Sequence, residues 1–144
     1  KELLEKFKDR EEWGVRVFAD LKKFRASIAQ FNPETKEKRG SGTAYLLRKK
    51  QEEGVEKAVH EKLAFFSEEI LDSLKELAFG YKVTKSSQRF SEKGEILISV
   101  FAFLLPKSKI RKFNQKLESL QKKYQKFGLS LTSSGPWPAY NFVS

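Results

Sequence analysis

The sequence contains no cysteine and no methionine, and its single histidine is His60. Without cysteine there is no disulfide framework, thiolate nucleophile or cysteine-ligated metal, and one histidine cannot supply the ligand set of a zinc site. The loop patterns G-x-x-x-x-G-K-S/T and G-x-G-x-x-G, which bind phosphates, are absent. No apolar run approaches the about 18 residues that a membrane-spanning helix needs. We therefore expect no membrane span, no enzymatic activity and no catalytic, cofactor-binding or metal-binding residues.

Negative charge is comparatively scarce: 19 aspartates and glutamates face 29 lysines and arginines, and the net charge is +10. The excess is concentrated between residues 106 and 128, where Glu118 is the only acidic residue. Such a segment attracts nucleic acid, a membrane surface or an acidic protein, or it serves only solubility. Because the segment has no acidic complement of its own, we expect Lys112, Lys116 and Lys123 to steer an acidic partner.

Apolar periodicity predicts four strands and two main helices, in the order strand, helix, strand, strand, helix, strand. The predicted strands are 12–18, 81–86, 95–105 and 129–132, and the predicted helices are 44–79 and 109–127. A short helix over 21–31 and a mobile loop over 32–42 follow the first strand. The loop is predicted because 32–42 contains no large apolar residue whose burial would offset its ordering entropy.

This order is that of an α+β, ferredoxin-like βαββαβ domain with a variable loop insertion. We expect an antiparallel sheet with the helices on one face and with the first and third strands central. The helix over 44–79 is unusually long: it would span roughly 54 Å, whereas a strand of eight residues spans about 26 Å. Either one end overhangs the domain or the helix breaks near Gly54.

The third strand is apolar on both of its predicted faces. Strict alternation places an aliphatic set against the helices: Ile96, Ile98, Val100, Ala102 and Leu104. Leu97, Phe101 and Phe103 then lie on the opposite, open face, where Phe101 and Phe103 are candidate docking residues. Aromatic residues on the open face of a basic sheet also favour an alternative, an RNA-binding module like the RNA recognition motif. However, residues 94–103 lack the leading basic residue and the glycine pair of that signature.

The segment 135–144 contains Pro136 and Pro138 on either side of Trp137. Proline has no N–H and biases the preceding residue toward an extended backbone, so it fits neither a regular helix nor the middle of a sheet. We therefore expect a stiff extended arm. Its rings, Trp137, Tyr140 and Phe142, are predicted to dock, because aromatic side chains gain much from burial at a small ordering cost.

Three stretches resemble the gas vesicle protein F/L (GvpF/GvpL) family. Residues 135–142, Gly-Pro-Trp-Pro-Ala-Tyr-Asn-Phe, are similar to its closing signature Gly-Pro-Trp-Pro-Pro-Tyr-x-Phe, from which Ala139 departs. Residues 11–18, Glu-Glu-Trp-Gly-Val-Arg-Val-Phe, resemble its EWGVKVY strand, and residues 42–50 resemble its G-x-x-YL-x-RK helix start. The resemblance implies a C-terminal domain over 11–144. It also implies that 1–10 is a linker helix from an N-terminal domain to which this sequence shows no match.

The resemblance further implies a non-enzymatic role in gas vesicle assembly, or as a minor structural component of the vesicle. Such a protein would bind the gas vesicle shell protein and other accessory gas vesicle proteins, and no specific nucleic acid or cofactor. It would reside in the gas vesicle or the cytoplasm of a prokaryote. The overhanging end of the long helix, with Tyr45 and Arg48, is a further candidate interaction site.

Overall fold

A computed structural model of the chain describes residues 9–30, 42–84 and 94–142. Its elements are β1 (Arg10–Ala19), α2 (Leu21–Gln30), α3 (Gly42–Lys75), β2 (Gly80–Thr84), β3 (Ile96–Pro106), α4 (Ile110–Gln125) and β4 (Leu129–Trp137). Short 3-10 helices occupy Lys107–Lys109 and Tyr140–Phe142. The predicted order of strands and helices is confirmed. The predictions for residues 1–8 and 32–41 lie outside the described residues, and Arg10 begins β1 instead of ending a linker helix.

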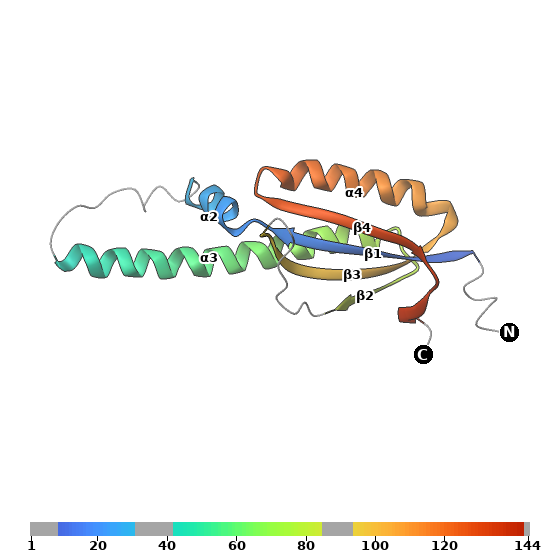
Figure 1. Cartoon of the computed structure of the whole chain (residues 1–144), viewed down its shortest axis with the longest axis horizontal. Coiled ribbons are helices and arrows are strands. Elements are labelled where there is room, and N and C mark those ends of the chain that lie inside the picture. Colours follow the sequence, from blue (N-terminus) through green and yellow to red (C-terminus); the bar gives the residue numbers. More distant parts are fainter. Residues whose placement is uncertain (1–8, 31–41, 85–93, 143–144) are drawn as a thin grey trace.

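The four strands form one antiparallel sheet in the order β2-β3-β1-β4 (Figure 1). β1 and β3 are therefore the central strands, as the ferredoxin-like pattern predicts. Their pairing places Trp13 opposite Phe103 and Val15 opposite Phe101. Because residues directly opposite each other share a face of the sheet, this register identifies the side chains that meet the helices.

Helices α3 and α4 cover one face of the sheet. Their buried side chains recur at the three- and four-residue steps of an amphipathic helix. These side chains are Val59, Leu63, Ile70 and Leu74 on α3, and Phe113, Leu117, Leu120 and Tyr124 on α4. They form one core with Val15 and Val17 of β1. The opposite face of the sheet, which carries neither α3 nor α4, is termed the open face below.

Helix α3 is one unbroken helix of 34 residues, about 51 Å long at 1.5 Å per residue. Its N-terminal part runs beyond the sheet while its C-terminal part lies over the strands (Figure 1). The predicted overhang is thus confirmed, and the alternative break near Gly54 does not occur. A glycine inside a helix costs only about 1 kcal/mol. An ion pair of 2.7 Å between Glu56 of α3 and Arg25 of α2 joins the two helices close to that position.

The prediction that Phe101 and Phe103 lie on the open face is wrong. The two side chains are 2% and 0% exposed, within the core beneath the helices. The ring centroid of Phe103 lies 5.5 Å from that of Phe113 on α4. Neither ring is therefore available to a partner of the folded domain.

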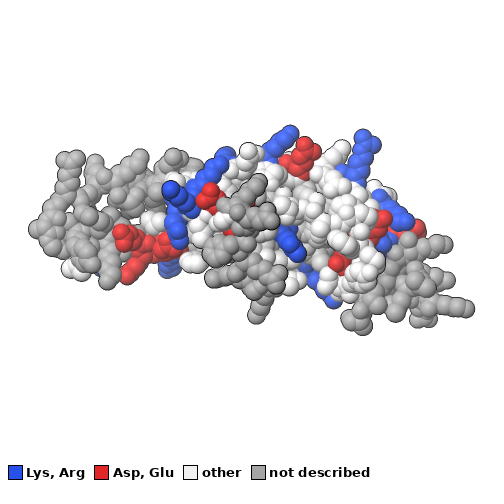
Figure 2. Space-filling model, viewed as in Figure 1, with Lys and Arg blue, Asp and Glu red and all other residues white. Residues whose placement is uncertain are grey.

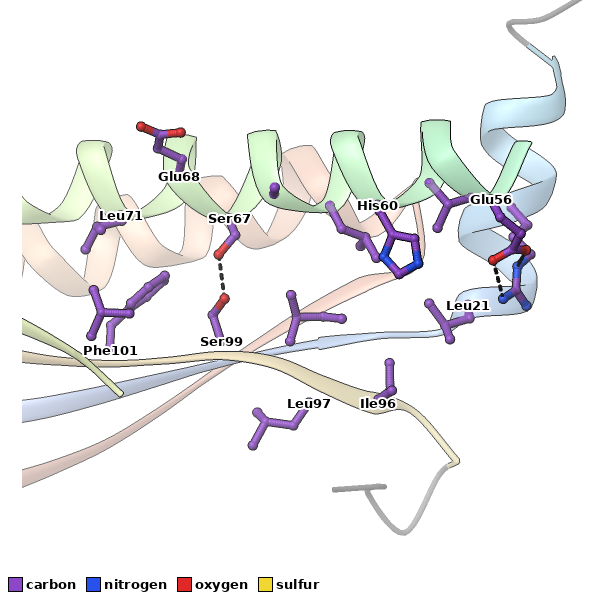
Figure 3. Close-up of a pocket in the computed structure, with 16 residues that line it drawn as sticks. Leu21, Glu56, His60, Ser67, Glu68, Leu71, Ile96, Leu97, Ser99 and Phe101 are labelled. Carbon is purple, nitrogen blue, oxygen red and sulfur yellow. Dashed lines mark hydrogen bonds and ion pairs between the residues drawn. The ribbon is translucent and has the colours of Figure 1, made fainter. Parts of the chain in front are cut away.

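A β-bulge explains why alternation failed on β3. Val17 of β1 is opposite Ser99, but the next residue, Phe18, is opposite Leu97, so Ile98 is an extra residue on β3. One extra residue reverses the side of the sheet to which every later side chain points. Leu97, before the bulge, points away from the helices as predicted (Figure 3). Beyond the bulge, the phenylalanines exchange faces with the aliphatic residues.

Candidate interaction surfaces

The C-terminal segment begins as part of the sheet. β4 continues to Trp137, five residues beyond the predicted strand end at 132, and pairs only with β1 at the edge. Pro136, which follows a cis peptide bond, fits there because an edge strand has a side that forms no ladder bonds. The predicted strand end is therefore wrong, whereas the exclusion of this segment from the middle of the sheet is confirmed.

After Trp137 the chain crosses the open face, and residues 138–142 are termed the C-terminal strap. Asn141 donates two hydrogen bonds to Glu12 of β1: its backbone N lies 2.8 Å from Oε1, and its Nδ2 lies 2.7 Å from Oε2. Phe142 reaches β2, where a Cβ built on Gly80 would lie 3.5 Å from its ring. Lys82 Nζ is 5.5 Å from the centroid of the same ring. The strap thus connects the β4 edge of the sheet to the β2 edge.

Among the described residues, Glu12 is the one charged side chain that is buried, with 6% of its surface exposed. A buried carboxylate is stable only when hydrogen bonds replace its lost water, and Asn141 supplies two of them. Sequence reasoning missed this role, because two glutamates at the start of a strand, Glu11 and Glu12, are ordinarily expected to be exposed to solvent. The partner is 129 residues away in the sequence, so no local pattern signals it.

The three aromatic residues of the arm are placed differently. Phe142 is partly buried against β2, Trp137 is 50% exposed and Tyr140 is 71% exposed. The structure therefore does not gather the three rings into one cluster. Trp137 and Tyr140 present free aromatic surface and remain predicted docking residues.

The basic face of α4 is the most evident charged surface. Lys112 and Lys116 are exposed, and Figure 2 shows lysine and arginine side chains projecting along the edge where α4 lies. Lys123 differs from them, because its Nζ lies 2.7 Å from Oε1 of Glu69 on α3. The expectation that Lys123 is free to steer an acidic partner is thus wrong, because an acidic residue outside the segment 106–128 already pairs with it. Lys112 and Lys116 remain candidate partner residues.

Tyr124 lies beside this ion pair, with its hydroxyl buried and without a hydrogen-bond partner in the described structure. Burial raises the pKa of Tyr124, and the nearby Glu69 carboxylate raises it further. In turn, Lys123 above all, together with Tyr124, lowers the pKa of Glu69.

We expect Tyr124→Phe to leave the free energy of unfolding at pH 7 unchanged or to raise it by about 1 kcal/mol, because it removes an unsatisfied buried hydroxyl. The raised pKa of Tyr124 predicts the direction in which stability changes at alkaline pH. Above the ordinary tyrosine pKa of 10.0, the unfolded chain loses a proton that the folded chain retains, so stability declines as pH rises. Urea unfolding at pH 7 and at about pH 11 should show a smaller decline for the variant. A large loss at pH 7 would reveal a hydrogen-bond partner for the hydroxyl.

The overhanging part of α3 exposes apolar side chains: Leu46 is 63% and Leu47 is 39% exposed. Tyr45 and Arg48 belong to the same helical segment, but their side chains lie outside the description. These two residues therefore stay predicted interaction residues, supported only by their position on the overhang.

A groove of about 790 Å³ lies between α3 and the first half of β3, with α2 at one end (Figure 3). Its lining is mostly apolar and includes Leu71 and Val83. Among its polar groups, the hydroxyls of Ser67 and Ser99 bond to each other across it, 2.5 Å apart. His60 also lines the groove, from α3. The groove offers mainly apolar contact.

In residues 9–30, 42–84 and 94–142, no group of three or more histidine, aspartate or glutamate side chains is arranged to hold a metal ion. None of the helices in those ranges is both long enough and apolar enough to span a membrane.

Comparisons with known proteins converge on one family. The family model of the gas vesicle synthesis proteins GvpL/GvpF matches residues 1–144. The crystal structure of the gas vesicle protein GvpF from Anabaena sp. PCC7120 is similar, with a TM-score of 0.66 and 22% identity over 99% of this chain and 54% of that one. For GvpF from Microcystis aeruginosa the values are 0.63, 18%, 98% and 57%. No curated protein sequence matches. The chain spans little more than half the length of these two structures, whose likeness establishes the fold.

Proposed function

The chain belongs to the GvpL/GvpF family of gas vesicle synthesis proteins, and from this membership we propose that it acts in gas vesicle assembly as a non-enzymatic binding protein. It binds the gas vesicle shell protein and accessory gas vesicle proteins, either during assembly or as a minor structural component of the vesicle. The observation that carries the proposal is the family match over residues 1–144. Its place of action is accordingly the gas vesicle or its surroundings in a prokaryotic cell.

The exposed side chains support binding rather than catalysis. Lys112 and Lys116 form a free basic surface on α4, and Trp137 and Tyr140 present aromatic surface near the strap. Basic residues on a surface attract an acidic partner over a distance and raise the rate of association. Exposed rings provide contact area once the partner has arrived.

The RNA-binding alternative loses its main support. A module of the RNA recognition motif type stacks bases on aromatic side chains that lie on the open face of the sheet. Here Phe101 and Phe103 are in the core. The central strands place Arg16 and Val100, which are directly opposite each other, on the open face instead. We therefore do not propose a role in nucleic-acid recognition.

Charge reversal on α4 tests the proposed function. We expect Lys112→Glu combined with Lys116→Glu, introduced into the complete protein in vesicle-forming cells, to reduce vesicle yield. Loss of electrostatic steering should slow association with an acidic partner by about tenfold at low salt, and added salt should reduce the difference from the unaltered protein. Vesicle yield is measured by microscopy and buoyancy, and association by surface plasmon resonance with each purified vesicle protein.

A matched control is Lys22→Glu combined with Lys57→Glu, two exposed positions on α2 and α3. It changes the net charge by the same amount and leaves α4 intact, so vesicles should form normally. Equal effects of the two pairs would mean that only total charge matters. Normal vesicles with the α4 pair would remove this surface from the proposed function.

A further inference from the structure

The edge strand β2 exposes an apolar row that is covered by no helix in the part of the chain that the structure describes. Phe79, immediately before β2, is 55% exposed, and Tyr81 and Val83 within it are 45% and 55% exposed. Tyr81 and Val83 are opposite the core residues Phe103 and Phe101, so they lie on the helix-covered side of the sheet, beyond the helices. Val83 also lines the groove beside α3. The helices therefore cover only part of this side of the sheet and leave the side chains of β2 exposed.

The two edges of the sheet differ in how they resist pairing with another strand. β4 contains Pro136, a register irregularity opposite Glu12 and Gly14, and exposed hydroxyl side chains such as Thr132. Proline and bulges are features with which proteins block strand addition at an edge. β2 contains neither a proline nor a bulge; its protection consists of its short length of five residues and the charge of Lys82, and the described chain pairs it only with β3. Its outer side therefore presents backbone groups that an extended segment can pair with.

The positive charge of the chain at and around β2 indicates which kind of partner this edge can bind. Lys82 lies between Tyr81 and Val83 and points to the open face, where its Nζ stands near Phe142. A second copy of the chain fits poorly, because antiparallel pairing that sets Tyr81 opposite Val83 also sets Lys82 opposite Lys82. Two chains of net charge +10 also repel each other. Neither of these repulsions applies to an acidic segment.

We propose that the outer edge of β2 binds an extended segment of a partner protein in which apolar residues alternate with acidic ones. The apolar residues continue the row of Tyr81 and Val83, the acidic residues lie on the side of Lys82, and the two backbones form an antiparallel or parallel ladder. The inference rests on the proposed function for the existence of a partner, and it names the chemistry of one contact of that partner. It concerns a surface separate from α4.

The test uses the complete chain and a dye-labelled peptide of alternating valine and glutamate, about seven residues long. We expect fluorescence anisotropy to show saturable binding, and hydrogen exchange to show protection of the backbone amides of residues 80–84 on binding. Lys82→Glu should weaken binding by up to about fivefold, the upper end of what one exposed charge pair contributes. Lys22→Glu, the same charge change at an exposed position on α2, should leave the affinity unaltered. Val83→Thr, which retains a β-branched side chain, should also weaken binding by loss of apolar contact.

Four outcomes would overturn the inference. The first is no binding of the peptide by the folded chain. The second is equal weakening by Lys82→Glu and Lys22→Glu, which would indicate attraction by net charge alone. The third is equal binding of a peptide with the same composition in which the valines and glutamates form two blocks. The last is a concentration-dependent dimer that protects residues 80–84 without peptide, since a second copy would then occupy the edge. None of these results bears on the vesicle yield of the α4 variants, so the two proposals fail separately.

Discussion

Replacing Phe103 by alanine is expected to lower the free energy of unfolding by about 3–5 kcal/mol, the usual cost of truncating a buried phenylalanine. Phe103 has no exposed surface and contacts Phe113 across the interface between β3 and α4. Small domains are stable by only about 5–15 kcal/mol, so the variant should be partly unfolded at moderate temperature. Urea denaturation followed by circular dichroism measures the difference.

Tyr81 provides the control for this experiment, because it is opposite Phe103 on the neighbouring strand and is 45% exposed. Tyr81→Ala should cost about 1 kcal/mol or less. If both variants lost about the same small amount of stability, Phe103 would lie on a solvated face, and the placement of the bulge at Ile98 would be wrong.

The second large effect is expected at the contact between Glu12 and the C-terminal strap. Glu12→Ala should destabilise the domain by about 2 kcal/mol, because it removes two hydrogen bonds to a charged group and leaves Asn141 without them. Deletion of residues 138–144 should cost a similar amount, since it removes the same bonds and the contact of Phe142 with β2. For a chain of this size, the melting temperature should fall by about 5–8 °C in either case.

Combining Glu12→Ala with the deletion of residues 138–144 tests whether the strap stabilises the domain mainly through its contact with Glu12. If the strap acts mainly through Glu12, the double variant should be hardly less stable than either single variant, whereas independent effects would add. Tyr140→Ala serves as the control within the strap, because Tyr140 is 71% exposed and its loss should change stability by under about 0.5 kcal/mol. Full additivity in the double variant would show that the bonds between Asn141 and Glu12 do not fasten the strap.

The sequence predicted those helices and strands whose buried side is determined by the regular spacing of apolar residues along the element itself. Apolar periodicity predicted α3, whose buried side chains include Val59, Leu63, Ile70 and Leu74. The length of that helix predicted either an overhang or a break near Gly54. The strand order followed from the succession of elements, since a βαββαβ chain has few sterically reasonable arrangements.

The failures all concern pairs of residues that are distant in the sequence. The bulge at Ile98 depends on how β3 pairs with Val17 and Phe18 of β1, about which the sequence of β3 alone contains no information. The neutralisation of Lys123 by Glu69 spans 54 residues. Candidate docking residues chosen by strand alternation were therefore placed on the wrong face, whereas Lys112 and Lys116, chosen by helical position and charge, are exposed.

The path of the strap has a mechanical consequence. An edge strand that ends freely can be peeled from its sheet one backbone bond at a time, because a force on its end acts on the outermost bond alone. Here a force applied beyond Phe142 is first transmitted to Glu12 in the central strand β1 and to the neighbourhood of Gly80 in β2. The strap must therefore lose its contacts with β1 and β2 before β4 can separate from the sheet at this end.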